Sequence, residues 1–201
     1  MPARSCALRL PRALTDCEVK FGGFRIQLHK AGDEVRLSSR NGKDFTDRFP
    51  SITAAVRGLG AKSAAIDGEL VSCDWEGKPD FYALMRRRTS GLCVWCFDLL
   101  TLNERDLRSL PLEQRKAKLG ALLAKTGDTT LRLSQTFDDG EKLLLAAARQ
   151  GLEGIVKSTV PRSYCSEVTR PRDPSLCTQR DCATLDASPV GRNCASASEP
   201  P

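Results

Sequence analysis

Residues 17–42 have the sequence CEVKFGGFRIQLHKAGDEVRLSSRNG, and this stretch gives the clearest indication of the fold. Apolar and polar residues alternate on both sides of the turn at residues 31–33, which predicts two β-strands. Two glycines interrupt the first strand, and Asn41-Gly42 is a strong turn signal after the second. A short turn between two strands predicts an antiparallel pair.

The rest of the chain mixes strands and helices without strict alternation. Apolar runs bounded by turn signals predict strands at residues 63–73, 92–100, 131–137 and 154–160. Helical spacing of apolar residues predicts four helices. They begin at a cap at Asp47 or Ser51, at Asp80 (ending in Arg86-Arg87-Arg88), at Pro111, and at Asp138 or Asp139 (running to about Gln150). This order indicates an α+β fold with mostly antiparallel sheets.

Composition limits the classes of protein that the chain can represent. It has 201 residues, of which 40% are hydrophobic and 28% charged, as in soluble globular proteins. No run approaches the roughly 18 apolar residues that a membrane-spanning helix needs, which excludes an integral membrane protein. The net charge of +6 suits an anionic partner.

Charge and proline divide the chain into three parts. Residues 158–201 contain five basic and five acidic residues, no lysine, and six of the eleven prolines. We therefore expect an irregular segment at residues 1–16, a basic folded domain at 17–157, and a poorly ordered tail at 158–201.

The nine cysteines indicate a reducing compartment. Their odd number and the lack of a signal-peptide stretch argue against a secreted disulfide framework. Cys93 and Cys96 form a CxxC, but residues three apart on a strand face opposite sides. This spacing disfavours a zinc site there.

Four polar residues interrupt apolar strands: Lys20, Glu69, Asp98 and Glu153. Each alone is best explained as a charge at a strand edge. Charges are rarely buried unless paired, so the four together suggest a shared cleft. A lysine partly withdrawn from water can lose its proton and act as a nucleophile.

Neighbouring residues supply what nucleotidyl transfer to that lysine would need. The two glycines would let a phosphate approach the backbone. Arg25 and Arg40 could bind phosphate or ribose oxygens, and Phe97 could stack on a base. Glu69 and Glu153 could hold a magnesium ion together with phosphate oxygens.

Five short motifs in order make the sequence recognisable. They are Lys20–Arg25, Ser39–Gly42, Asp67–Leu70, Phe97–Leu100 and Glu153–Val156. With these motifs the chain resembles the ATP-dependent DNA ligases of the covalent nucleotidyltransferase superfamily, most closely the bacterial repair-type ligase domain. The resemblance covers about residues 17–157 and implies the ATP-grasp-like adenylation fold of ligases.

The resemblance implies a role for each motif. Lys20 would attack the α-phosphate of ATP, release pyrophosphate and form lysyl-AMP, and the AMP would then pass to a DNA 5′-phosphate before a 3′-hydroxyl seals the nick. The residues that would bind ATP are Arg25, Arg40, Glu69, Phe97 and Lys157, and those that would bind Mg²⁺ or Mn²⁺ are Glu69 and Glu153.

The resemblance also implies a setting. The expected partners are nicked or broken double-stranded DNA and end-binding or polymerase repair proteins. We expect a monomer in the bacterial cytoplasm, associated with the nucleoid and not with a membrane.

Departures from the family pattern cluster at two places. Gly22 replaces the aspartate of the first motif, on the face that residue 20 would share along a strand. Lys157 lies one residue before the expected position, which Ser158 occupies, and such a shift turns a side chain to the other face. A lysine-free tail lacks the Lys-x-Lys of the fifth motif, and no length remains for the OB-fold domain.

We therefore expect impaired ligation by this chain, and we hypothesise a truncated or frameshifted gene. Two alternatives stay open: a non-catalytic remnant that binds nucleotide or DNA, and a related RNA ligase or capping-type nucleotidyltransferase.

Overall fold

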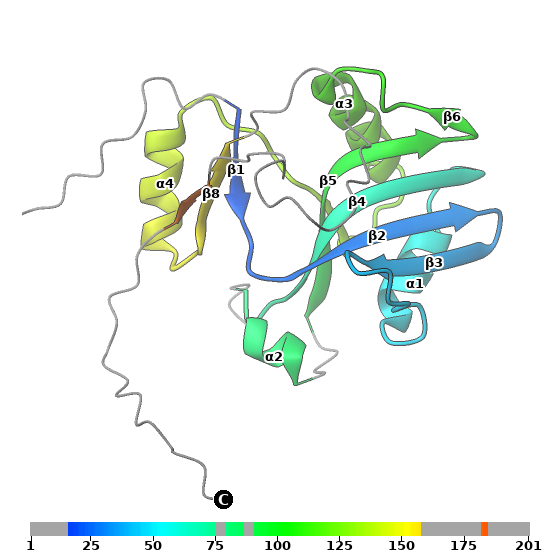
Figure 1. Cartoon of the computed structure of the whole chain (residues 1–201), viewed down its shortest axis with the longest axis horizontal. Coiled ribbons are helices and arrows are strands. Elements are labelled where there is room, and N and C mark those ends of the chain that lie inside the picture. Colours follow the sequence, from blue (N-terminus) through cyan, green and yellow to red (C-terminus); the bar gives the residue numbers. More distant parts are fainter. Residues whose placement is uncertain (1–15, 75–78, 87–90, 158–181, 185–201) are drawn as a thin grey trace, which may run out of the picture.

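The computed structural model describes residues 16–74, 79–86 and 91–157, together with a strand at 182–184. The larger of its two sheets has six strands (Figure 1). Its strands are β2 (Phe24–Ala31), β3 (Glu34–Ser39), β4 (Ser63–Ser72), β5 (Leu92–Leu102), β6 (Arg105–Asp106) and β7 (Leu131–Leu133). The order is β3-β2-β4-β5-β6, with β7 parallel to β5 and the other pairings antiparallel. The predicted α+β class with mostly antiparallel pairing is confirmed.

The β2–β3 hairpin follows directly from the local sequence. Gly32 in its turn has φ of 60°, a left-handed conformation that glycine adopts without strain. Gly23, just before β2, has a different constraint, because a Cβ there would overlap the carbonyl oxygen of Leu70 on β4. Close approach of β2 to β4 therefore depends on Gly23.

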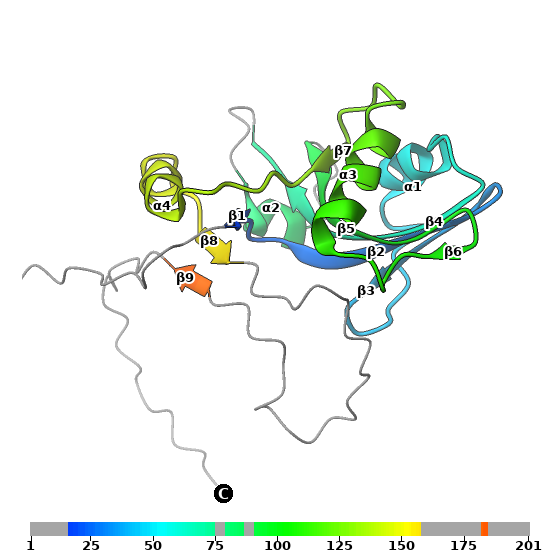
Figure 2. The same cartoon turned by 90° about the horizontal axis from the view of Figure 1, so that it is seen from above.

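Two helices, α1 (Pro50–Arg57) and α3 (Leu112–Leu123), cover one face of this sheet (Figure 2). The main hydrophobic core lies between them and the sheet. Its fully buried members include Ile26, Leu28, Ile52, Ile66, Leu70, Leu99 and Leu119. A short helix, α2 (Phe81–Met85), follows β4.

A smaller unit carries the predicted nucleophile. Strands β1 (Cys17–Lys20), β8 (Gly154–Lys157) and β9 (Cys182–Thr184) form a second antiparallel sheet. Helix α4 (Gly140–Arg149) packs on it with its own small core around Cys17, Leu143 and Ile155. Figures 1 and 2 show this unit beside the larger sheet, joined to it through the segment between β1 and β2.

The predicted helix starts were partly right. Asp80 and Asp139 cap α2 and α4, and their carboxylates accept from the backbone N–H of Ala83 and Lys142. The prediction of Asp47 or Ser51 as the cap of α1 is wrong. Phe49 precedes the helix without a side-chain cap, because Pro50 at its first position fixes φ and lacks an N–H.

The strand predicted at residues 131–137 ends at Leu133. Beyond it the chain leaves β5, and Phe137 makes a single bridge to Cys17 in the small sheet. Between β5 and α3, Arg105–Asp106 forms the short strand β6, which the sequence did not predict. Helix α2 ends at Met85, and residues 87–90 lie outside the described residues.

The predicted N-terminal segment and most of the predicted tail lie outside the described residues. The strand β9 is the exception. It pairs with β8 through register partners such as Ile155 and Ala183, which the sequence did not predict.

Candidate active site

Lys20 is the last residue of β1 and lies opposite Gly154 of β8. This register brings the residue before Gly154 to the lysine, and Lys20 Nζ is 2.6 Å from Glu153 Oε1. The two side chains are 28% and 44% exposed, so the ion pair remains open to a ligand from solvent. Two residues more than 130 positions apart in the chain thus meet as the sequence predicted.

A cavity of about 820 Å³ opens in front of this pair. Lys20, Gly22, Glu69, Glu153 and Phe81 are among the residues that line it. Glu69 Oε1 accepts a hydrogen bond from the backbone N–H of Gly23 at 3.1 Å, which fixes its carboxylate at the start of β2. Three of the four polar residues that interrupt strands therefore share a cleft.

A second, smaller cavity of about 40 Å³ also borders Lys20. Its lining includes Glu18, Glu69, Trp95 and Phe97. Phe97 is 8% exposed. The Trp95 ring stacks on Phe21 with centroids 4.4 Å apart and planes 8° apart. The lysine and the aromatic side chain proposed for base stacking thus border one cavity.

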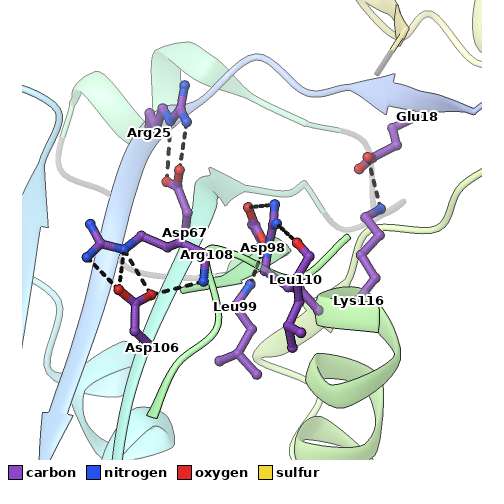
Figure 3. Close-up of polar contacts among 10 residues, drawn as sticks. Glu18, Arg25, Asp67, Asp98, Leu99, Asp106, Arg108, Leu110 and Lys116 are labelled. Atoms are coloured by element: carbon purple, nitrogen blue, oxygen red, sulfur yellow. Dashed lines mark hydrogen bonds and ion pairs between the residues drawn. The ribbon is translucent and has the colours of Figure 1, made fainter. Parts of the chain in front are cut away.

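Arg25 faces the sheet and not the cavities. It donates to both carboxylate oxygens of Asp67, from Nε at 3.3 Å and from Nη2 at 2.6 Å (Figure 3). Its guanidinium carbon also lies 5.5 Å from the centre of the Phe97 ring. Asp67 is 1% exposed, so this pair holds the guanidinium beside the aromatic ring.

Two other predicted ATP-binding residues lie apart from this group. Arg40 follows the end of β3, is exposed, and lines neither cavity. Lys157 is the last residue of β8 and lies opposite Cys17 in register. The fifth-motif region after it lies outside the described residues.

The prediction that Asp98 shares the cleft is wrong. Its carboxylate turns into the protein and accepts from Arg115 on α3 at 2.7 and 2.9 Å, and Arg115 also donates to the carbonyl of Leu110 (Figure 3). Arg115 is 1% exposed. The charge on β5 is therefore paired inside the core, as buried charges must be.

Sequence reasoning missed a polar cluster behind the small cavity. Glu18 Oε1 is 2.9 Å from Lys116 Nζ on α3 (Figure 3). Glu18 Oε2 accepts from Ser134 Oγ at 2.6 Å. Residues two apart on a strand share a face, so Glu18 could have been placed beside Lys20 from spacing alone. Nothing in the sequence pointed to Lys116.

The carboxylates at the large cavity can supply some, but not all, of the oxygen ligands of a divalent cation such as magnesium. Magnesium is typically held by one or two carboxylates plus substrate phosphate oxygens. Glu69 and Glu153 both line this cavity and can supply such carboxylates. Among the described residues, no group of three or more histidine, cysteine or acidic side chains could hold a metal ion. The donor set therefore fits an ion that arrives with a phosphate ligand.

Gly22 leaves a defined space in this site. A Cβ added at Gly22 would lie 3.4 Å from Glu153 Oε2, an ordinary contact. An aspartate, as in the first motif of the family pattern, would thus point its carboxylate toward Glu153. With glycine at this position, no carboxylate stands there beside Glu153.

Comparison with known proteins decides the family. A family model described as the ATP dependent DNA ligase domain matches residues 5–170. This chain belongs to the ATP-dependent DNA ligase domain family. The resemblance carried by the five motifs is confirmed.

Relatives of this ligase domain come from several bacteria. The multifunctional non-homologous end joining protein LigD of Pseudomonas aeruginosa is 38% identical over 161 residues, which is 78% of this chain and 19% of that protein. A probable DNA ligase of Beutenbergia cavernae is 36% identical over 157 residues, covering 73% of this chain and 30% of that protein. The chain thus spans less than a third of the length of these two relatives.

Solved ligase structures share the fold. The ligase domain of M. tuberculosis LigD has a TM-score of 0.62 and 29% identity, covering 70% of this chain and 47% of that one. A mycobacterial DNA ligase D complexed with ATP and MES gives 0.61 and 30%, covering 70% and 46%. These similarities confirm the nucleotidyltransferase domain predicted from the motifs. No helix in the described part of the ligase domain is long and apolar enough to cross a membrane.

Proposed function

We propose that this chain is the adenylation domain of an ATP-dependent DNA ligase, in which Lys20 carries AMP. The observation that carries the proposal is the Lys20–Glu153 pair, which borders a cavity that Glu69 also lines, while Lys20 also borders the smaller cavity of Phe97. The lysine attacks the α-phosphorus of ATP, a P–N bond forms, and pyrophosphate leaves with the electrons of the broken P–O bond.

The Lys20 ammonium must lose a proton before it can attack. Glu153 Oε1, at 2.6 Å, is positioned to accept that proton. The same carboxylate holds the amine at the mouth of the large cavity, where a phosphate chain can enter. Holding the reacting groups in place is the main contribution of the protein in such transfers.

The remaining residues divide between the two ends of the nucleotide. Phe97 stacks on the base and Glu69 binds the ribose from the start of β2. Arg25, which Asp67 holds beside the Phe97 ring, supports that ring. Arg40 and Lys157 are further proposed ATP ligands, supported by the motif resemblance. When bound, a Mg²⁺ or Mn²⁺ ion held by Glu69 and Glu153 would neutralise phosphate charge.

The proposed polymer substrate is nicked or broken double-stranded DNA. AMP would pass from Lys20 to a DNA 5′-phosphate, and a 3′-hydroxyl would displace it to join the strands. We expect nick sealing by this chain alone to be weak, because Gly22 removes one carboxylate beside Lys20. The net charge of +6 supports contact with a polyanion.

The test is incubation with α-labelled ATP and magnesium, followed by denaturing electrophoresis. We expect a covalent label in the wild-type chain, none in Lys20→Ala, and an unchanged label in Lys43→Ala, since Lys43 is exposed in a loop. Addition of nicked duplex should then discharge the label. An unlabelled wild-type chain that still binds nucleotide or DNA would instead support a non-catalytic binding module.

A further inference from the structure

Lys116 occupies an unusual place for a lysine. Its side chain is only 12% exposed, and its ammonium contacts three acceptors: the carboxylate of Glu18 at 2.9 Å, the carbonyl of Ser134 at 2.9 Å and the hydroxyl of Thr136 at 3.0 Å. An ammonium has three protons to donate, so this set satisfies it completely. Fixing a lysine side chain in this way costs up to about 2 kcal/mol of conformational entropy, and surface lysines are rarely held so firmly.

The contact joins the two units of the fold. Lys116 lies on α3, which packs on the large sheet, whereas Glu18 lies on β1 of the small sheet. Each sheet has its own hydrophobic core. The Glu18–Lys116 ion pair between them therefore fixes the position of β1 relative to β5. Figure 3 shows the two side chains meeting between the strand and the helix.

Because Glu18 and Lys20 lie on the same strand, fixing Glu18 also fixes the position of Lys20. Glu18 lies two residues before Lys20, so both side chains leave β1 on the same face. Both also line the small cavity with Phe97. The second oxygen of Glu18 is held by Ser134 at 2.6 Å, and its side chain is 13% exposed. A carboxylate fixed by two partners leaves β1 little freedom to shift.

We propose that Lys116 is a positioning residue for adenylation, which clamps β1 through Glu18 and so aims Lys20 at the nucleotide. This inference rests on the proposed function of Lys20. Lys116 does not touch the reacting atoms; it acts by keeping the nucleophile at a fixed distance from the base cavity. A misplacement of about 1 Å can cost about a hundredfold in rate.

The test compares Lys116→Met with Lys118→Met, which changes an exposed lysine on the same helix. Methionine keeps the length of the side chain and removes the ammonium. We expect the maximal rate of Lys20 labelling to fall about 10- to 100-fold in Lys116→Met, while the ATP concentration for half-maximal rate changes less than about threefold. Lys118→Met should label like the wild type, and Lys116→Arg should recover most of the rate.

A double variant separates the clamp from a general effect on the fold. Lys116→Met and Glu18→Gln remove the same contact, so the double variant should label no more slowly than the slower single variant. A loss of labelling rate in the double variant equal to the product of the losses in the two single variants would overturn the proposal. So would a normal maximal rate in Lys116→Met, or a loss that appears only in the half-maximal ATP concentration.

Hydrogen exchange gives a readout that does not depend on ATP chemistry. Residues 17–20 form the strand that pairs with β8, and the Cys17 N–H donates to the carbonyl of Phe137. We expect faster amide exchange in this strand in Lys116→Met but not in Lys118→Met. If the wild-type chain does not label, the proposed function fails while this measurement still judges the clamp. Unchanged exchange in β1 would refute the clamp even in a chain that labels.

Discussion

The buried pair between Arg115 and Asp98 provides a sharp test of how the core is stabilised. We predict that Arg115→Met destabilises the protein severely. The substitution leaves the Asp98 carboxylate at 9% side-chain exposure with the backbone N–H of Leu99 as a remaining donor. It also deprives the carbonyl of Leu110 of its donor.

The magnitude follows from this burial. Removing one partner of a buried ion pair costs about 3–5 kcal/mol, because the other charge stays buried without compensation. For a chain of this size 1 kcal/mol corresponds to about 2–4 °C in melting temperature, so we expect a fall of roughly 10 °C. Thermal and urea unfolding followed by circular dichroism would measure it.

The chain offers a matched control. Arg108 makes the same kind of two-pronged contact with Asp106, but the two side chains are 42% and 53% exposed. Arg108→Met should therefore shift the melting temperature far less. The double variant Arg115→Met with Asp98→Asn should regain much of the loss, because no unpaired charge remains. Equal effects of the Arg115 and Arg108 substitutions would refute the reasoning.

Three further predictions concern the cap, the cavity and the thiols. Asp80→Ala removes the cap of α2 and should cost about 1 kcal/mol, measured by urea unfolding; an unchanged midpoint would contradict it. Gly22→Asp places a second carboxylate beside Glu153 and should make Lys20 labelling faster and more steeply dependent on magnesium, whereas an unchanged magnesium titration would count against the metal assignment. Burial raises the pKa of Cys93 from 9.0 to about 12, so the folded state keeps a proton that the unfolded chain loses. The protonated Cys93 thiol should therefore contribute fully to stability below pH 9 and progressively less toward pH 12. Iodoacetamide at pH 8 should modify the half-buried Cys73 before Cys93. The reverse order would show that Cys93 is accessible.

Local sequence patterns were enough to predict many of the strands and helices and some of the residues that meet in the site. Alternation and turn residues were enough to place the β2–β3 hairpin, because its register depends on neighbours in the chain. The meeting of Lys20 with Glu153 was expected because both are polar residues set in apolar stretches. The register that joins them, Lys20 opposite Gly154, came only from the structure.

Other features depend on contacts that no local pattern records. The spacing of Asp98 resembles that of a cleft residue, and only the approach of α3 with Arg115 shows that it is a core charge. Lys116 looks like any polar residue on a helix until its partner on β1 is known. Arg25 was assigned to phosphate or ribose oxygens from its charge. In the structure it forms an ion pair with Asp67, which lies two strand positions from Glu69.

The most direct test of the account is to locate the adenylate. The full chain is incubated with ATP and magnesium, digested, and its peptides are sequenced by mass spectrometry, with Lys20→Arg treated alongside. We predict a single AMP adduct, on the Lys20 side chain, that disappears in Lys20→Arg. An adduct on another lysine, or one that persists in Lys20→Arg, would contradict it.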